Sequence, residues 1–204
     1  MHTYMATSSN IETHPWEPFL PEGAKILMLG SFPPKENRWS MDFFYPNFNN
    51  DMWRIMGLVF YGDKDRFIAD AGTGSGQVRR FDKEKIIRFC SSHGIALYDT
   101  VSKARRLNDN ASDKFLETVE PVDIMALLDR IPECRTVIAT GEKAARIIAS
   151  RLGCDVPKTG CFVDIEIDGK NIRFYRLPSS SRAYPMSIDR KAEAYSVIKG
   201  ILQY

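Results

Sequence analysis

Apolar residues stand in short runs along the chain, and most runs end at a glycine, serine, proline or aspartate. A continuous apolar run of four or five residues is typical of a strand buried on both faces, as in a parallel sheet. Runs of this kind predict strands at 25–29, 95–98 and 135–139. Segments with helical spacing separate them, so the pattern predicts an α/β fold.

Five segments carry apolar residues three or four positions apart, which is the spacing of one helix face. These predicted helices span 51–60, 82–93, 122–131, 141–152 and 189–202. Asn50 lies at the start of the first helix, Gly94 follows the second, and Pro121 lies near the start of the third. Each of these residue types favours the helix end at which it stands.

A hairpin is predicted toward the C-terminal end. Residues 161–167 alternate in part between apolar and polar, and Asp168-Gly169 joins them to a strand at 171–177. An Asp-Gly pair between two such runs is a strong signal for a tight hairpin turn. We therefore expect several parallel strands and one hairpin in a single domain over residues 1–204, with the polar segment 1–21 as a flexible tail.

Two loops rich in small residues leave predicted strands. They are Gly-Ser-Phe-Pro-Pro at 30–34 and Leu-Pro-Ser-Ser-Ser-Arg-Ala at 177–183. Proline lacks the ladder donor and glycine has no side chain to pack, so each strand must end there. The carboxyl edge of an open α/β sheet is the usual ligand site, and we expect the two loops to form opposite walls of one cleft.

Composition and charge narrow the classes of function. The 204 residues are 44% hydrophobic and 26% charged, and the formal net charge of +2 permits phosphate contacts without requiring them. Four cysteines form no CxxC pair and three histidines have no metal-binding spacing, so we expect neither a disulfide framework nor a metal. No apolar run approaches the roughly 20 residues of a membrane span, and we expect a cytoplasmic protein without membrane contact.

A glycine-rich stretch at 72–76 resembles a phosphate-binding loop in composition only. It follows no predicted strand and lacks the Lys-Ser/Thr pair that gives such loops their chemistry. A flexible surface loop is the interpretation that its polar surroundings favour.

Five short motifs occur in one order along the chain. They are LGSFPP (29–34), FFYPNFNNDMWRIMG (43–57), HGIALYDT (93–100), TGEKAARII (140–148) and LPSSSRAY (177–184). Together they resemble the uracil-DNA glycosylase superfamily, most closely its hypoxanthine-DNA glycosylase branch. The chain departs from that branch at Pro34, Met52 and Arg182, where glycine, phenylalanine and proline are usual, and has an insertion between Pro46 and Asn50.

The resemblance implies a three-layer α/β/α sandwich with a central, mostly parallel four-stranded sheet, to which the hairpin strand at 162–167 would be an addition. It implies hydrolysis of the N-glycosidic bond of a deaminated base, uracil or hypoxanthine, flipped out of DNA during base excision repair. The partner is then DNA containing a deaminated base, no cofactor is needed, and we expect a monomer. No lysine stands in a matched motif position to form a Schiff base, so water is the expected nucleophile.

The resemblance places the catalytic groups in three motifs. Ser31 stands where many superfamily members carry an acid or amide, and its hydroxyl is a weak base. Asn50, by its distance from the Trp of the second motif, is the expected catalytic residue, with Asn49 and Asn47 as alternatives. An asparagine here would equally serve as a helix N-cap. Asp99 either orients water or binds a loop amide.

Substrate contacts are expected from the first two motifs. The Phe32 ring stands at the position that stacks on the flipped base in the superfamily, although a core role is the alternative. Backbone amides of the first motif supply donors to the base. The expected substrate-binding residues are Gly30, Phe32, Pro33, Tyr45 and Asn49.

The last motif offers contacts to the DNA backbone. Ser179, Ser180 and Ser181 supply short donors, and Arg182 adds charge. An ordinary turn before the final helix is the alternative for this loop. Further basic candidates, for which a solvated face is the more usual role, are Arg79, Arg80, Lys103, Arg105 and Arg106.

Two other functions compete with an active glycosylase. A catalytically inactive module that binds nucleic acid or a nucleobase in the same cleft remains open because Ser31 replaces the usual water-positioning group. A serine hydrolase built on 179–181 is disfavoured, because there is no GxSxG motif and His93 is the only internal histidine that could act as its base.

Overall fold

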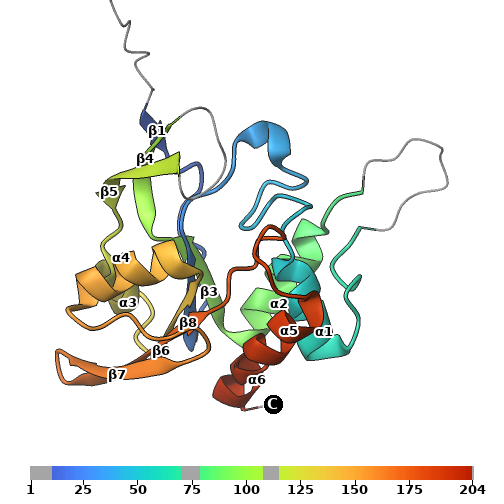
Figure 1. Ribbon diagram of the computed structural model, residues 1–204. Coiled ribbons are helices and arrows are strands. Elements are labelled where there is room, and N and C mark those ends of the chain that lie inside the picture. Colours follow the sequence, from blue (N-terminus) through green and yellow to red (C-terminus); the bar gives the residue numbers. More distant parts are fainter. Residues whose placement is uncertain (1–10, 70–78, 108–114, 204) are drawn as a thin grey trace, which may run out of the picture.

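The computed structural model describes residues 11–69, 79–107 and 115–203, and its centre is a five-stranded sheet (Figure 1). The strands are β2 (Ile26–Gly30), β3 (Ile95–Asp99), β6 (Thr136–Thr140), β7 (Phe162–Ile167) and β8 (Lys170–Leu177). Their order is β3-β2-β6-β8-β7, in which the first four are parallel and β7 pairs antiparallel with β8. The sheet is therefore mixed and five-stranded: four strands are parallel, and β7 is the hairpin strand that was expected as an addition to them.

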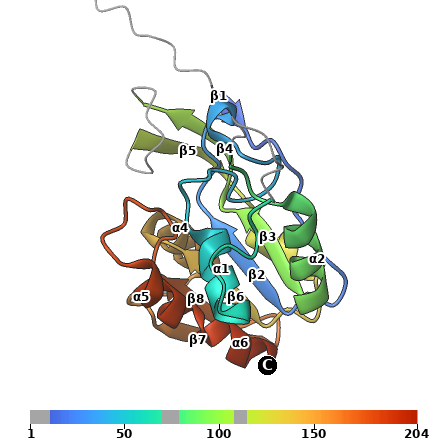
Figure 2. The same ribbon diagram turned by 90° about the vertical axis from the view of Figure 1, so that its right-hand side faces the viewer.

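Helices cover both faces of this sheet, as Figures 1 and 2 show. On one face lie α3 (Ile124–Asp129) and α4 (Glu142–Leu152). On the other face lie α1 (Met52–Tyr61), α2 (Lys83–His93), α5 (Ile188–Tyr195) and α6 (Val197–Leu202). The predicted three-layer arrangement follows, because strands buried on both faces need helices on each side.

Local signals account for most element boundaries. The five residues of β2 are all buried, as their continuous apolar character predicts. Asp82 caps α2 by accepting a bond from the Lys85 amide, and Gly94 ends it in the left-handed conformation at φ 66°. In the hairpin turn, Asp168 and Gly169 have φ of 50° and 74°, as a type I′ turn requires.

A second, three-stranded antiparallel sheet was not predicted. It has the order β1-β4-β5 and consists of β1 (Ile11–Thr13), β4 (Val101–Arg106) and β5 (Leu116–Pro121). Only Thr100 separates β3 from β4, so the chain passes directly from the large sheet into the small one. The small sheet thus lies beyond the carboxyl end of β3.

Three predicted boundaries are wrong. Pro121 ends β5 instead of opening a helix, so the helix predicted at 122–131 shortens to α3 with Asp123 as its cap. The helix predicted at 189–202 divides at Ser196 into α5 and α6. The tail predicted at 1–21 is structured from residue 11 onward, because β1 pairs with β4 and Phe19 exchanges backbone hydrogen bonds with Leu97.

Two earlier expectations fall outside the described residues: the glycine-rich stretch at 72–76 and the first ten residues of the tail. A short 3₁₀ helix, η1 (Glu36–Arg38), follows the loop at 30–34. Among the described helices, none has the length and apolar character needed to cross a membrane.

The strand order creates a switch point at β2. The chain moves from β2 to its neighbour β3 on one side, and later returns to β6 on the other side. Loops that leave β2 and β6 therefore diverge, which opens a crevice at the carboxyl edge of the sheet, where open α/β folds bind ligands. Gly30, Asp99 and Thr140 end their strands at this edge.

Candidate functional site

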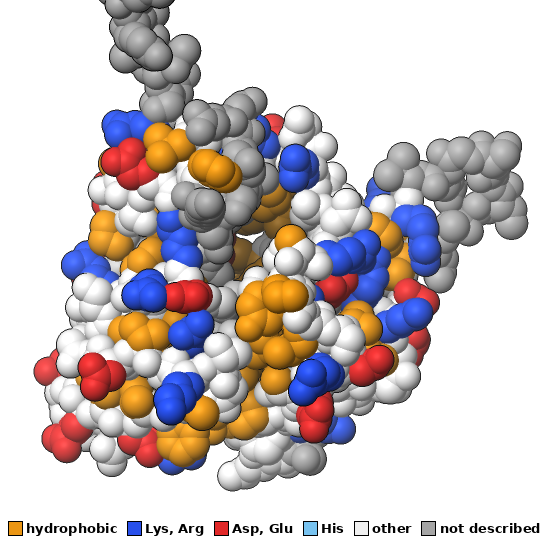
Figure 3. Space-filling model, viewed as in Figure 1, with side chains coloured by type: hydrophobic (Ala, Val, Ile, Leu, Met, Phe, Trp, Pro, Cys, Tyr) orange, Lys and Arg blue, Asp and Glu red, His pale blue; other side chains and the backbone are white. Residues whose placement is uncertain are grey.

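A cleft of about 540 Å³ occupies the carboxyl edge of the large sheet. Its walls are the loop after β2, the segment before α1 and the loop after β8, with the strand ends at Asp99 and Thr140 between them. Figure 3 shows this face of the molecule hollowed near its centre, with Lys and Arg side chains on both sides of the hollow. The two loops that the sequence predicts as walls of one cleft do lie together.

The cleft collects nearly all of the residues that the sequence singles out. Its lining includes Gly30, Ser31, Phe32, Pro33, Tyr45, Asn47, Asn49, Asn50, Asp99, Ser179, Ser180 and Ser181. Arg182 is absent from this lining. Lining residues that were not singled out include Arg38, Thr140 and Tyr184; the last two belong to the fourth and fifth motifs but were given no role.

Backbone bonds join the segment before α1 to the loop after β8. The Asp51 amide donates to the Ser180 carbonyl at 2.9 Å, and Asn50 forms an isolated antiparallel bridge with Ser181. These contacts join two motifs about 130 residues apart in the chain. The walls of the cleft therefore hold each other in place.

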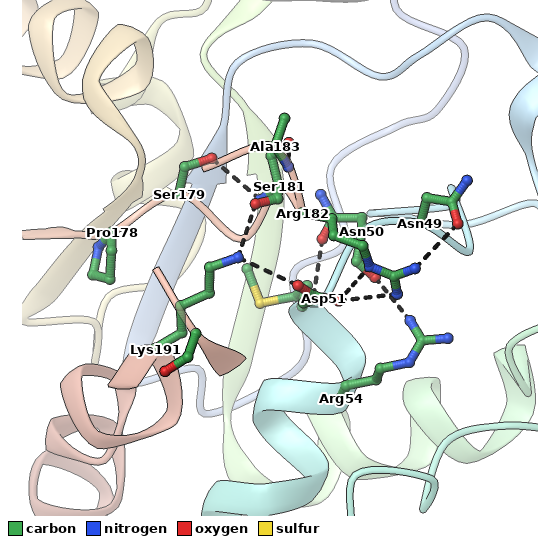
Figure 4. Close-up of polar contacts among 12 residues, drawn as sticks. Asn49, Asn50, Asp51, Arg54, Pro178, Ser179, Ser181, Arg182, Ala183 and Lys191 are labelled. Carbon is green, nitrogen blue, oxygen red and sulfur yellow. Dashed lines mark hydrogen bonds and ion pairs between the residues drawn. The ribbon is translucent and has the colours of Figure 1, made fainter. Parts of the chain in front are cut away.

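A buried ionic cluster lies beneath this junction (Figure 4). Lys191 of α5 is 1% exposed, and its Nζ donates to Asp51 Oδ2 at 3.3 Å and to the Ser181 carbonyl at 2.8 Å. Arg182 donates from Nη2 to Asp51 Oδ1 at 3.1 Å and from Nη1 to Asn49 Oδ1 at 3.3 Å. Arg182, expected to bind DNA, here turns toward Asp51, with about half of its side chain exposed.

Asn50 lines the cleft and also bonds to the first turn of α1. Its Oδ1 accepts a hydrogen bond from the Met52 amide at 2.9 Å, so Asn50 holds the first residue of α1 from the position just before the N-cap residue Asp51. The Asn50 carbonyl accepts from the buried Arg54 guanidinium at 3.2 Å. Because Oδ1 is committed to the helix, the side-chain NH₂ is the Asn50 group best placed to contact a ligand in the cleft.

Asp99 lies directly over Gly30 at the ends of two neighbouring strands, which pair at these two residues. A Cβ at position 30 would come within 2.3 Å of Asp99 Oδ1, so only glycine leaves room for the carboxylate. Asp99 is 7% exposed and is the only carboxylate among the described residues that line the cleft. It supplies the negative charge of the site.

His14 was not singled out from the sequence, yet it contacts Asp99. Its Nε2 lies 3.0 Å from Asp99 Oδ2, and the imidazole is 2% exposed. The ring packs among Trp16, Phe32, Phe44 and Tyr98. No local pattern could have found this pair, because 85 residues separate its members.

Tyr45 reaches the cleft from a strained backbone position. Its φ of 52° lies in the left-handed region, which is uncommon for an aromatic residue. Its hydroxyl lies 3.0 Å from Thr140 Oγ1, and Thr140 in turn donates to the Leu29 carbonyl. Burial and the negative charge of Asp99 hold the pKa of the Tyr45 phenol well above its usual range, so it stays neutral.

Phe32 serves both the cleft and the core. It is half-buried and lines the cleft, while it packs on the small apolar cluster of Val101, Ala104 and Leu116. Arg106 lies 5.5 Å from the centre of the Phe32 ring and donates to the Pro33 carbonyl and to Glu12. Arg106 is 6% exposed, so the solvated face expected for it is wrong, and it holds the loop at 30–34 instead.

The serine hydrolase alternative does not fit this geometry. His93 ends α2, before the first residue of β3, whereas the cleft lies at the opposite end of that strand. Its Nδ1 bonds to the Phe89 carbonyl at 2.8 Å. His93 therefore does not lie beside the serines at 179–181 as a base must.

Within the described ranges, no group of three or more histidine, cysteine, aspartate or glutamate side chains is placed to hold a metal ion. The cleft thus offers one carboxylate, a neutral phenol, amides and hydroxyls. Such a set can bind a polar, planar ligand and place a water molecule beside it.

Comparison with known proteins defines the fold. No protein-family model matches the chain, and no curated protein matches it. Among solved structures, it resembles the solution NMR structure of a protein from Methanosarcina acetivorans that is described, provisionally, as a uracil DNA glycosylase. The TM-score is 0.64 at 23% identity, and the match covers 96% of this chain and 100% of that one, so the two proteins share a fold.

Proposed function

We propose that this protein is a monofunctional DNA glycosylase that hydrolyses the N-glycosidic bond of a deaminated base, uracil or hypoxanthine, flipped out of DNA. The observation that carries the proposal is the cleft, in which the first, second and last of the five motifs converge with Asp99. The fold shared with the Methanosarcina protein, whose description names uracil DNA glycosylase, supports it. The five motifs extend it to the hypoxanthine-DNA glycosylase branch.

The reaction separates charge, and the cleft has groups suited to both ends. Positive charge develops on the sugar and negative charge on the departing base, so an active site needs an anion or oriented water at one end and donors at the other. The Ser31 amide and the Asn50 NH₂ are donors for the base. The half-buried Phe32 ring offers a face for stacking, an interaction worth about 1–3 kcal/mol per base.

The loop after β8 holds the DNA strand in this proposal. Its three serines line one wall of the cleft and offer hydroxyls and backbone amides at close range. The Arg182 side chain is about half exposed, so its guanidinium can donate to a DNA phosphate while it keeps part of its hydrogen bonding to Asn49 and Asp51. We further propose that the protein acts as a cytoplasmic monomer without a cofactor.

The proposal is tested by single-turnover cleavage of labelled duplexes that carry uracil, hypoxanthine or xanthine. Wild type is compared with Asn50→Ala and Asn49→Ala. We expect abasic product from at least one duplex with wild type, and a slower rate in Asn50→Ala than in Asn49→Ala, because Asn49 is the more exposed and bonds Arg182. Absence of abasic product from all three duplexes would refute the glycosylase.

One observation favours a second candidate, a binding module without activity. Ser31 lines the cleft where the superfamily carries a water-positioning group. In that case the three duplexes would bind more tightly than an undamaged duplex, and none would be cleaved. Binding and cleavage measured on the same samples distinguish the two candidates.

A further inference from the structure

We infer that His14 is a positioning residue that fixes Asp99 as the group that accepts a proton from the attacking water. The inference rests on the proposed function and assigns the water-activating role within it. Three features of the cleft carry it: the isolation of Asp99 as an anion, its hydrogen bond to His14, and the commitment of Asn50 to the helix.

Asp99 lines the cleft and bonds to His14. Oδ2 accepts from His14 Nε2 at 3.0 Å, while Oδ1 lies over Gly30. The Asp99 side chain is about 10% exposed, and Asp99 lines the cleft. The Asp99 carboxylate is thus anchored by His14 while it lines the cleft, the placement that a general base needs.

The other candidate acceptor, Asn50, is less suited to this step. An amide oxygen is a far weaker base than a carboxylate, and Asn50 Oδ1 already accepts from the Met52 amide. The Ser31 hydroxyl is weakly basic as well. By chemistry and by position, Asp99 is the group in the cleft that can take a proton.

His14 keeps its donor toward Asp99 in either protonation state. Its Nδ1 lies 2.9 Å from the Trp16 carbonyl oxygen and 3.2 Å from the Trp16 amide nitrogen. A charged ring donates from both nitrogens, to the carbonyl and to Asp99. A neutral ring accepts the Trp16 amide at Nδ1, which leaves the proton on Nε2 for Asp99.

The surrounding rings leave His14 little freedom to turn. Tyr98 packs at 4.6 Å between ring centres, and Phe32 meets the imidazole edge-on at 5.7 Å. The imidazole therefore fixes the plane of the Asp99 carboxylate. It also contacts Phe32, the residue proposed to stack on the base. The small sheet contributes to this arrangement, because β1 ends one residue before His14 and pairs with β4.

In the resulting step, a lone pair of the water oxygen forms a bond to C1′ of the deoxyribose. The C1′–N bond breaks, and its electron pair leaves with the base. One water proton passes to Asp99 Oδ1, and the departing base takes up a proton from solvent. Asp99 later returns its proton to solvent, so the enzyme is regenerated without a co-reactant.

The test is single-turnover cleavage of the duplex that wild type cleaves fastest, with DNA affinity and thermal unfolding measured on the same proteins. His14→Phe keeps a ring but loses the donor, and we expect the rate constant to fall by about 10- to 100-fold because the carboxylate is misplaced, while the Kd for DNA changes less than about twofold. His14→Gln, which retains an N–H donor, should recover much of the rate. His93→Gln, far from the cleft, is the matched control and should leave the rate unchanged.

Asp99→Asn completes the experiment. We expect it to lose about 100-fold or more in rate. Because His14 acts through Asp99, adding His14→Phe to Asp99→Asn should cost little more. A wild-type rate in folded His14→Phe, or equal losses in His14→Phe and His14→Gln, would overturn the inference and leave the glycosylase standing. An inactive wild type would overturn both.

Discussion

The ionic cluster at Lys191 allows a quantitative prediction about stability. In Asp51→Asn, the Lys191 ammonium remains buried at 1% exposure without its carboxylate. Removing one partner of a buried ion pair destabilises a protein by about 3–5 kcal/mol. Asparagine has nearly the same volume as aspartate, so the decrease in unfolding free energy comes from the missing charge and not from a cavity.

The converse change should be milder. In Lys191→Met, Asp51 keeps the Arg182 guanidinium at 3.1 Å, and Arg182 is open to water on its other side. The main loss is the charged hydrogen bond to the Ser181 carbonyl, worth about 1.5–3 kcal/mol, which the apolar methionine offsets in part. We therefore expect Lys191→Met to lose less than Asp51→Asn.

The double variant is the decisive measurement. With both charges gone, no buried ion is left without a partner, so the combined loss should be smaller than the sum of the single losses by about 1–3 kcal/mol. Urea unfolding at neutral pH measures all four proteins. Arg190→Met, at an exposed position on the same helix, is the control and should change stability by less than about 0.5 kcal/mol. Additive losses, within about 0.5 kcal/mol, would show that the cluster does not act as a buried pair.

Three further outcomes follow from the same structure. Gly30→Ala places a Cβ 2.3 Å from Asp99 Oδ1, so it should lower the cleavage rate and reduce the free energy of unfolding by about 1–3 kcal/mol. Gly200→Ala, which has open space around it, is the control and should not destabilise the protein. Equal effects of the two substitutions on stability would contradict the close approach at Gly30. Phe32→Leu should weaken transition-state stabilisation, measured from the single-turnover rate constant divided by the Kd for DNA, by about 1–3 kcal/mol. An unchanged ratio would exclude stacking of Phe32 on the base. Burial raises the pKa of Tyr195, so the folded state holds this proton to higher pH than the unfolded chain. Its contribution to stability is complete below about pH 10 and declines above it; Tyr195→Phe should show a shallower alkaline loss in urea unfolding, and an identical slope would refute this.

Local patterns predicted most of the large sheet and the helices around it. The apolar run of β2, the Asp-Gly turn of the hairpin and the glycine that ends α2 each act over a few residues, so their effect can be deduced without knowing the fold. The loops at 30–34 and 177–183 were placed in one cleft by the same logic, because parallel strands end at one edge. That reasoning needed no contact between distant residues.

Pairings over long distances could not be predicted in this way. The strands of the small sheet are short and rich in charged residues, as in β4, Val-Ser-Lys-Ala-Arg-Arg. They form because β1 and β5 pair with the two edges of β4. The sequence favoured a solvated position for Arg106, whereas in the structure it is buried and donates to Glu12 and to the Pro33 carbonyl. Arg182 likewise bonds to Asp51, a contact that depends on the fold because the two residues are far apart in the sequence.

The sequence by itself determined the α/β class, most element boundaries and the set of residues that could line a cleft, because periodicity and turn chemistry are properties of neighbouring residues. Only the tertiary structure decided which of those residues meet. The bond between His14 and Asp99 spans 85 positions, and that between Lys191 and Asp51 spans 140. Such contacts depend on where folded elements place their ends, and no short stretch of sequence records that position.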